Sequence, residues 1–350
     1  DVYKRQDSNE YDIEKEKIDF NSPKKYIFKV MNKISKEYNY FRAGEYLPAN
    51  YNNDEINNFV NFCDRNSIDC IIFNQGNMIT LIQDIKKKLK RKNVKIISWV
   101  HSNYDIYENK YFKKCKNSLK KGIESSDAVI CLTSTDEKEY QKLNKWTYCI
   151  PNPLTIHSNE RSQLTNKSII LTTRVNYKTK GIDFLFPIAR ELPESWDISI
   201  AGPMSKIAKI QTLYYSLKYK TFGKIKFLGS KRGEGLINHY LSGSIFLSTS
   251  RWEGFGLSIT EAMSLGLPII SFDTMGPAYI LDNGKYGIII DKYDVNEMSK
   301  KIKLLINDEN LKEKYASLAY ERSKDFTIEK IYIKWEEIFK KIEMVKLNES

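Results

Sequence analysis

The segment Ser250–Leu267 reads SRWEGFGLSITEAMSLGL and is the most informative part of the chain. An apolar, β-rich run ends just before it at Ser248, and a helical pattern follows the turn Gly254-Phe255-Gly256. Glycines in such a turn let backbone N–H groups approach a ligand closely, and the first turn of a helix carries a partial positive charge. The segment therefore predicts a strand, a tight turn and a helix, with the turn placed to receive a phosphate oxygen or a polarised hydroxyl group.

Two carboxylates flank this turn, Glu253 before it and Glu261 in the helix after it. Glu253 follows the carboxyl end of a strand, where doubly wound sheets bind ligands, so we expect Glu253 to be a functional residue. For Glu261 the residues favour a structural role, because Ser258-Ile259-Thr260-Glu261 fits a capping box with Glu261 at the third helical position. A capping Glu can still present an oxygen to a ribose, so the two roles of Glu261 are compatible.

Three further residues lie at strand ends in the predicted pattern. Arg174 directly follows one strand and Lys180 precedes the next helix, so both emerge at the same sheet edge as Glu253. Two fixed cations there could neutralise a diphosphate, although two ordinary surface cations are the alternative in a chain with 56 Lys and Arg residues. His101 ends a strand of the first half and would face the second half across a cleft. A lone histidine is more often structural, and the residues by themselves favour that interpretation.

Short β-rich runs alternate with helical patterns along the chain, which predicts two doubly wound α/β units with parallel strands buried on both faces. The predicted strands cover 69–73, 94–100, 128–132, 147–150, 168–173, 196–201, 224–228, 245–248, 268–272 and 286–290. The predicted helices cover 54–66, 78–92, 106–123, 136–144, 182–192, 206–219, 236–241, 257–265, 295–306, 311–324 and 328–345.

The Pro- and Asn-rich stretch over 151–166 predicts a linker between the two units. The last predicted helix is long and rich in aromatic residues, with enough apolar surface to pack across both units. The domains we predict are a polar segment over 1–25, an N-terminal domain over 26–152, a C-terminal domain over 166–325 and a C-terminal helix over 326–350.

Composition narrows the class of protein. With 41% hydrophobic and 29% charged residues, the chain is neither disordered nor collagen-like. The net charge of +12 favours anionic partners, and basic residues cluster over 86–95 and 113–121. These clusters are either solvated helix faces or a surface for an anionic membrane. A nucleic-acid partner is disfavoured, because the basic run over 86–95 has neither interleaved aromatic residues nor a known binding module.

Five cysteines without a Cys-x-x-Cys pair predict neither a disulfide framework nor a zinc site, and they favour a reducing compartment. Cys131 and Cys149 lie in apolar runs, as buried reduced thiols do. His101, His157 and His239 are too scattered in the sequence to predict a metal site.

Several motifs together resemble the family 4 glycosyltransferases. The resemblance is specific over about Ile169 to Asp291 and looser in the first half, and it implies the GT-B fold: two Rossmann-like domains facing each other across a cleft that holds the active site. The motifs are the E-x7-E spacing of Glu253 and Glu261, Arg174-x5-Lys180-Gly181, Ala201-Gly202, Phe227-Leu228-Gly229, and, more loosely, His101, Ser134 and Ile150-Pro151-Asn152.

The resemblance implies a role for each matching residue. Arg174 and Lys180 would hold the donor diphosphate, Glu261 would take the ribose hydroxyls, Glu253 would orient the donor sugar, and His101 would reach the transferred sugar from the other domain. The implied catalytic residues are therefore Glu253 and His101. The implied donor-binding residues are Arg174, Lys180, Gly202, Ser230, Lys231, Gly254, Phe255, Gly256, Leu257 and Glu261, with Ser230 and Lys231 beside the nucleobase.

The implied activity is that of a retaining hexosyltransferase. It would move a sugar from a UDP- or GDP-linked donor to a polysaccharide or lipid-linked acceptor in cell-surface glycan synthesis, with no cofactor and no metal. The chain has no D-x-D motif to suggest a metal, and cations with a helix dipole can stabilise a leaving diphosphate without one. We expect a cytoplasmic protein, peripheral on the inner face of the plasma membrane.

The chain departs from the family pattern in three ways. Thr173 stands where Gly is usual, and Tyr279 stands where Glu is usual. The family also begins with a strand and a Gly-rich loop that nothing before Asp69 matches, so we expect an incomplete N-terminal domain. Two alternatives stay open: a nucleotide-sugar epimerase of the same fold, and an inactive fragment that still binds nucleotide.

Overall fold

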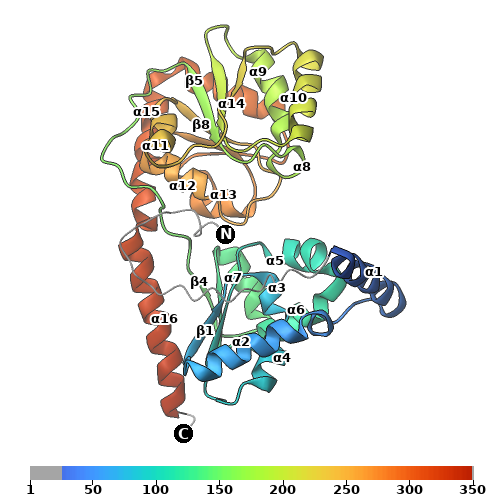
Figure 1. Cartoon of the computed structure of the whole chain (residues 1–350). Coiled ribbons are helices and arrows are strands. Elements are labelled where there is room, and N and C mark those ends of the chain that lie inside the picture. The colour runs from blue at the N-terminus through green and yellow to red at the C-terminus, as the bar shows by residue number, and fades with distance from the viewer. Residues whose placement is uncertain (1–25, 349–350) are drawn as a thin grey trace.

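The chain forms two α/β lobes, each built on a parallel sheet, and the long last helix leaves the second lobe and runs along one side of the first (Figure 1). The computed structural model describes the backbone of residues 26–348 and the side chains of residues 31–342. The polar segment predicted over 1–25 lies outside the described residues. The two predicted parallel α/β units are confirmed, but only the second is doubly wound: the first sheet keeps the sequence order of its strands, without a reversal.

The first sheet has the order β1-β2-β3-β4, with all neighbours parallel. Its buried Ile and Val side chains pack against α2, α4 and α6. The strands are β1 (Cys70–Phe73), β2 (Lys95–Trp99), β3 (Ala128–Cys131) and β4 (Thr147–Cys149). The helices are α1 (Tyr26–Ala43), α2 (Asn53–Arg65), α3 (Gly76–Ile79), α4 (Ile82–Lys88), α5 (Tyr104–Ile106), α6 (Lys116–Glu124) and α7 (Ser134–Gln141), with short turns η2 (Pro48–Tyr51), η3 (Tyr107–Tyr111) and η4 (Lys113–Cys115).

The helix predictions for this lobe need three corrections. The helices expected over 78–92 and 106–123 are both broken, and α1 was not expected. In the second break the Phe112 N–H donates to the Tyr107 carbonyl five residues back, 2.8 Å away. This wider turn brings the two rings together, with centroids 5.2 Å apart, where an α-helix would point them in different directions.

The second sheet has the order β10-β9-β8-β5-β6-β7, again parallel throughout. The strand order reverses between β5 and β8, and ligands of doubly wound sheets bind at the carboxyl ends of the strands at that point. The strands are β5 (Ser168–Thr172), β6 (Asp197–Ala201), β7 (Ile225–Phe227), β8 (Ile245–Ser248), β9 (Ile269–Phe272) and β10 (Ile288–Ile290). The helices are α8 (Tyr177–Lys180), α9 (Leu185–Glu191), α10 (Lys206–Tyr219), α11 (Gly233–Leu241), α12 (Leu257–Ser264), α13 (Met275–Ile280), α14 (Val295–Asn307) and α15 (Glu309–Ser323), with short turns η5 (Ile182–Phe184), η6 (Asp282–Gly284) and η7 (Lys324–Phe326).

The last helix, α16 (Ile328–Asn348), leaves the second lobe and packs on the first sheet. Its buried residues Ile331 and Ile338 join the core formed by Ile97 and Ile130. The Trp335 ring lies edge-on to Trp99, with centroids 5.1 Å apart. The first sheet therefore takes part of its core from the end of the chain.

The stretch expected as a linker over 151–166 is irregular but packed against the second lobe. Leu154 N donates to Phe326 O at 2.7 Å, and Ser162 N donates to Leu265 O at 2.9 Å. No helix among the described residues has both the length and the apolarity that crossing a membrane requires.

Candidate active site

The loops that follow β5 and β8 are joined to each other at the point where the strand order reverses. Arg251 N donates to Thr179 O, and the Thr249 hydroxyl donates to Lys180 O, each at 2.9 Å. The Arg251 guanidinium also forms a two-pronged ion pair with Asp183, at 2.8 and 2.5 Å. These contacts fix the position of the residues that each loop carries.

Lys180 and Glu253 meet across this junction. The Lys180 ammonium donates to Glu253 Oε2, and the Ser250 hydroxyl donates to the same oxygen at 3.3 Å. Both charged side chains are about one-fifth exposed, at 21% and 22%. Arg174 lies exposed at the end of β5, on the same sheet edge. The structure thus brings together Lys180 and Glu253, which are 73 positions apart in the chain.

The glycine turn leads directly into α12. Gly256 has φ +113°, a conformation that side chains rarely adopt, and it is the residue from which α12 begins. The expected capping box is wrong: the helix starts at Leu257, so Ser258 lies inside the first turn and Glu261 lies too far along to reach the N-terminus. The first N–H groups of α12 therefore receive no capping side chain, which leaves them for a ligand.

Glu261 instead connects three parts of the second lobe. Its carboxylate accepts hydrogen bonds from the Tyr240 hydroxyl of α11, at 2.6 Å, and from the Thr155 hydroxyl of the interdomain stretch. Glu261 is buried, and this burial raises the pKa of its carboxyl group above the usual value. Sequence reasoning missed both partners, because neither lies at a spacing that points to Glu261.

Gly202 holds the ends of three neighbouring strands close together. Its N–H donates to Gly229 O at 2.8 Å, and a Cβ on Gly202 would stand 2.6 Å from the Thr173 carbonyl carbon. Ser230 and Lys231 are exposed just beyond Gly229, on the way into α11. The predicted donor residues in these loops therefore share one edge of the sheet with Arg174.

His101 comes from the first lobe and lies against the glycine turn of the second. A Cβ on Gly254 would stand only 2.6 Å from His101 O, so the two backbones are in close contact. The imidazole packs on Trp99, with centroids 4.6 Å apart. Burial lowers the pKa of His101 to about 4, so the ring is neutral near pH 7.

Other contacts between the lobes were not expected from the sequence. The Asn103 amide donates to Met275 Sδ at 3.0 Å, and the Lys110 ammonium lies 3.8 Å from the centre of the Trp252 ring. Tyr279, which replaces the usual acid, has its hydroxyl 3.6 Å from Cys149 Sγ of the first lobe. One nearby feature could have been found in the sequence, because the spacing Thr133-x-x-Asp136 is typical of a helix N-cap. The Thr133 hydroxyl caps α7, and buried Asp136 accepts a hydrogen bond from Tyr104 N at 2.9 Å.

The buried histidines predict a dependence of stability on pH. Burial lowers the pKa of both His101 and His239, so the unfolded chain takes up protons below about pH 6.5 that the folded chain does not. We expect the free energy of unfolding to fall as pH falls from about 6.5 to about 4, by up to roughly 1.4 kcal/mol per pH unit for each histidine. Urea unfolding at a series of pH values measures this slope.

His101→Gln is expected to reduce that slope, and His157→Gln, at an exposed position, is expected to leave it unchanged. Burial raises the pKa of Asp136 and Glu261, which has the opposite effect on the slope, so the comparison between variants isolates the histidine. An unchanged slope in His101→Gln would show that the imidazole is protonated alike in both states.

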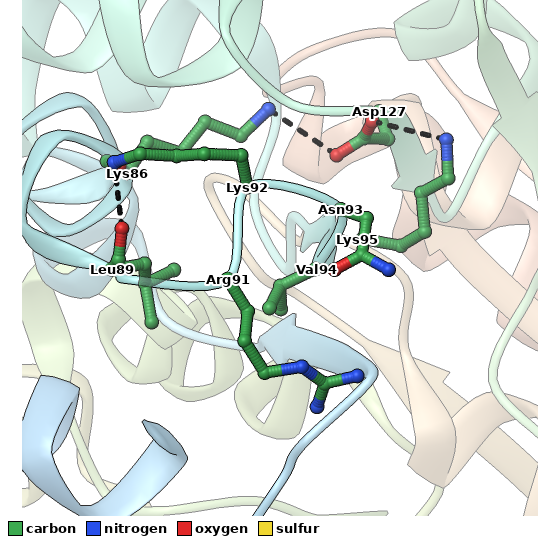
Figure 2. A pocket seen from close by; sticks show the side chains of 8 residues that line it. All are labelled: Lys86, Leu89, Arg91, Lys92, Asn93, Val94, Lys95 and Asp127. Carbon is green, nitrogen blue, oxygen red and sulfur yellow. Dashed lines mark hydrogen bonds and ion pairs between the residues drawn. The ribbon is translucent and has the colours of Figure 1, made fainter.

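A basic pocket of about 280 Å³ lies elsewhere, beside the amino ends of β2 and β3 (Figure 2). Asp127 stands between Lys86 and Lys95, with nitrogen–oxygen distances of 3.2 and 3.7 Å. Arg91 pairs with Asp69 at 2.6 Å, and the Lys92 ammonium donates to Leu89 O at the end of α4. Four basic residues of the cluster over 86–95 therefore make contacts within the first lobe, at the amino edge of its sheet.

The fold is that of GT-B glycosyltransferases of known structure. An Anabaena protein, HepE, solved with UDP-glucose, superposes with a TM-score of 0.70 at 16% identity, over 83% of this chain and 82% of that one. Residues 155–322 match the family described as "Glycosyl transferases group 1".

Two relatives extend the match beyond this region. An uncharacterized glycosyltransferase of Haemophilus influenzae is 27% identical over 254 residues, which is 70% of each chain. A poly(ribitol-phosphate) alpha-N-acetylglucosaminyltransferase of Staphylococcus aureus is also 27% identical, over 68% of this chain and 48% of that one. Together with the family match, these similarities support a glycosyl transfer role for this chain.

Proposed function

We propose that this chain is a retaining, metal-independent glycosyltransferase that moves a hexose from a nucleotide-diphosphate sugar to a polysaccharide or lipid-linked acceptor. The observation that carries the proposal is the meeting of the Lys180–Glu253 pair with the glycine turn, which itself lies against His101 of the other lobe. The cations and the free helix N–H groups suit the diphosphate of a nucleotide sugar. The histidine from the opposite domain suits its sugar.

The charges of the site suit a leaving diphosphate. As the bond between the anomeric carbon and the diphosphate oxygen breaks, negative charge grows on the diphosphate, and Lys180, Arg174 and the N-terminus of α12 would offset it. A bound diphosphate competes with Glu253 for the Lys180 ammonium. The released Glu253 carboxylate can then accept hydrogen bonds from the donor sugar.

His101 and Glu261 complete the proposed donor site. The neutral His101 ring can accept a hydrogen bond from a sugar hydroxyl or donate one to it. Glu261 would contact the ribose through lone pairs that Tyr240 and Thr155 leave unused. Ser230 and Lys231 would lie beside the base. The complex of HepE with UDP-glucose supports a nucleotide-sugar donor, and the five free cysteines support the cytoplasmic location.

Calorimetric titration with UDP and then GDP, with and without EDTA, tests the donor site. We expect one nucleotide to bind in the micromolar range, EDTA to change nothing, and both Lys180→Ala and Glu261→Ala to weaken binding. Lys178→Ala is the matched control, since it removes an exposed cation from the same short helix. Failure of both nucleotides to bind a chain that circular dichroism shows to be folded would contradict the proposal.

Product analysis with the nucleotide sugar that binds separates the two remaining alternatives. Transfer with retention gives a glycoside of unchanged anomeric configuration, whereas an epimerase would return a changed sugar without any acceptor. Binding without either product would identify an inactive nucleotide-binding chain.

A further inference from the structure

The helix α10 carries apolar side chains on two opposite faces. Its inner face, with Ala208, Tyr215 and Tyr219, packs on the core of the second lobe. Its outer face exposes a continuous stripe in which Ile207, Ile210 and Leu217 have 60–71% of their surface free; the other exposed members are Leu213, Tyr214 and the nearby Phe222. A helix that is apolar on both sides is normally buried, and nothing among the described residues covers this stripe.

Helix α1 turns its polar side toward the protein and its apolar side outward, which is the reverse of an ordinary surface helix. Its polar side faces the first lobe, where the Asn39 amide donates to the Tyr51 hydroxyl at 2.6 Å and the Lys36 ammonium lies over the Tyr51 ring. Its apolar side chains point outward at spacings of three and four residues, which places them on one face. These are Met31, Ile34, Tyr38 and Phe41, of which Phe41 is 91% exposed.

Positive charge borders both stripes. The segment of α10 contains Lys206, Lys209 and Lys218 and no acidic residue. The segment of α1 that carries its stripe also contains Lys33 and Arg42, and the single acid between them in the sequence, Glu37, pairs with Lys114 at 2.5 Å. Apolar side chains edged by cations are the pattern of helices that lie in the surface of an anionic membrane.

We propose that α10 and α1 together form a docking surface for an anionic lipid bilayer. Both helices lie on the side of the molecule away from α16, one in each lobe (Figure 1). An extended, negatively charged lipid surface can cover two separate stripes at once, taking the apolar side chains into its interface and the lysines against its headgroups. This inference does not depend on the proposed transfer reaction, although it would bring the site to a lipid-linked acceptor.

Co-sedimentation with lipid vesicles tests the proposal on the full chain. One vesicle preparation is phosphatidylcholine alone, and the other contains phosphatidylcholine and phosphatidylglycerol in equal amounts. We expect binding to the anionic vesicles only, weakened by added salt. The double variants Ile210→Glu/Leu217→Glu and Ile34→Glu/Phe41→Glu should each weaken this binding by about tenfold or more. Leu304→Glu is the matched control, because Leu304 is exposed on α14, and it should bind as the wild type does.

Thermal unfolding and nucleotide titration of the same samples show that each variant is folded and has an intact donor site, so failure here is distinguishable from failure of the proposed function. Three results would overturn the proposal: no vesicle binding, equal binding to neutral vesicles, or binding that both double variants leave unchanged. A dimer that Ile210→Glu/Leu217→Glu dissociates, with no vesicle binding, would assign the α10 stripe to a second copy of the chain instead.

Discussion

Replacement of Lys180 with Ala is expected to lower kcat/KM for sugar transfer by roughly a hundredfold to a thousandfold, which is the usual effect of removing one preorganised group that stabilises developing charge. The ammonium is held at the junction of the β5 and β8 loops, where it contacts Glu253. Without it, a leaving diphosphate loses one fixed cation and also faces the Glu253 carboxylate with its partner removed. Steady-state kinetics with the nucleotide sugar identified by titration measure the effect.

Lys178→Ala controls for a general loss of positive charge and should stay within about threefold of the wild type. Lys180→Arg should recover part of the activity if charge is what matters, since Arg keeps the charge but not the geometry. Wild-type kcat/KM in Lys180→Ala would place the diphosphate elsewhere.

Gly276→Ala is the second change with a large expected effect. A Cβ at this position would stand 2.6 Å from the carbonyl carbon and 2.7 Å from the Cα of Phe255, both of them main-chain atoms of the glycine turn. Gly276 N also donates to Glu253 O at 3.3 Å. The added methyl group must push α13 and the turn apart, so we expect the free energy of unfolding to fall by about 1–3 kcal/mol and nucleotide binding to be lost.

Denaturant unfolding and nucleotide titration measure the two parts of this prediction. The matched control is Gly235→Ala in α11, where an added Cβ meets no atom within 4 Å. That change should leave stability equal or raise it by up to about 1 kcal/mol, because Ala favours a helix over Gly. Nucleotide binding equal to wild type in Gly276→Ala would mean that the turn does not position the donor.

The strands of this fold could be predicted from the sequence, because a parallel strand buried on both faces is a short continuous apolar run. All ten strands of the described residues lie within two residues of the predicted bounds. The helices were less predictable where side-chain packing decides the backbone. The wide turn at Tyr107–Tyr111 depends on Tyr107 and Phe112 sharing one side, and no local propensity encodes it.

The candidate site also has a part that could be predicted from the sequence and a part that could not. Residues at the carboxyl ends of β5 and β8 could be placed together from strand position alone, which is why Lys180 and Glu253 were both expected there. The capping box at Ser258 was wrong because α12 starts earlier, from Gly256 in a left-handed conformation. Contacts between the lobes, such as Asn103 with Met275 across 172 positions, depend on how two folded domains meet, and a sequence pattern carries no information on that.

The hydrogen bond between Leu154 N and Phe326 O limits how the two domains can move. Within the described residues the chain passes between the domains twice, and this bond holds both passages side by side. The two passages therefore act as one pivot. Because Ile331 belongs to the core of the first domain and Trp335 packs against it, α16 must turn with that domain, and the bending falls on the few residues around Thr327. A motion that separates Gly254 from His101 therefore has to bend both passages at the same place.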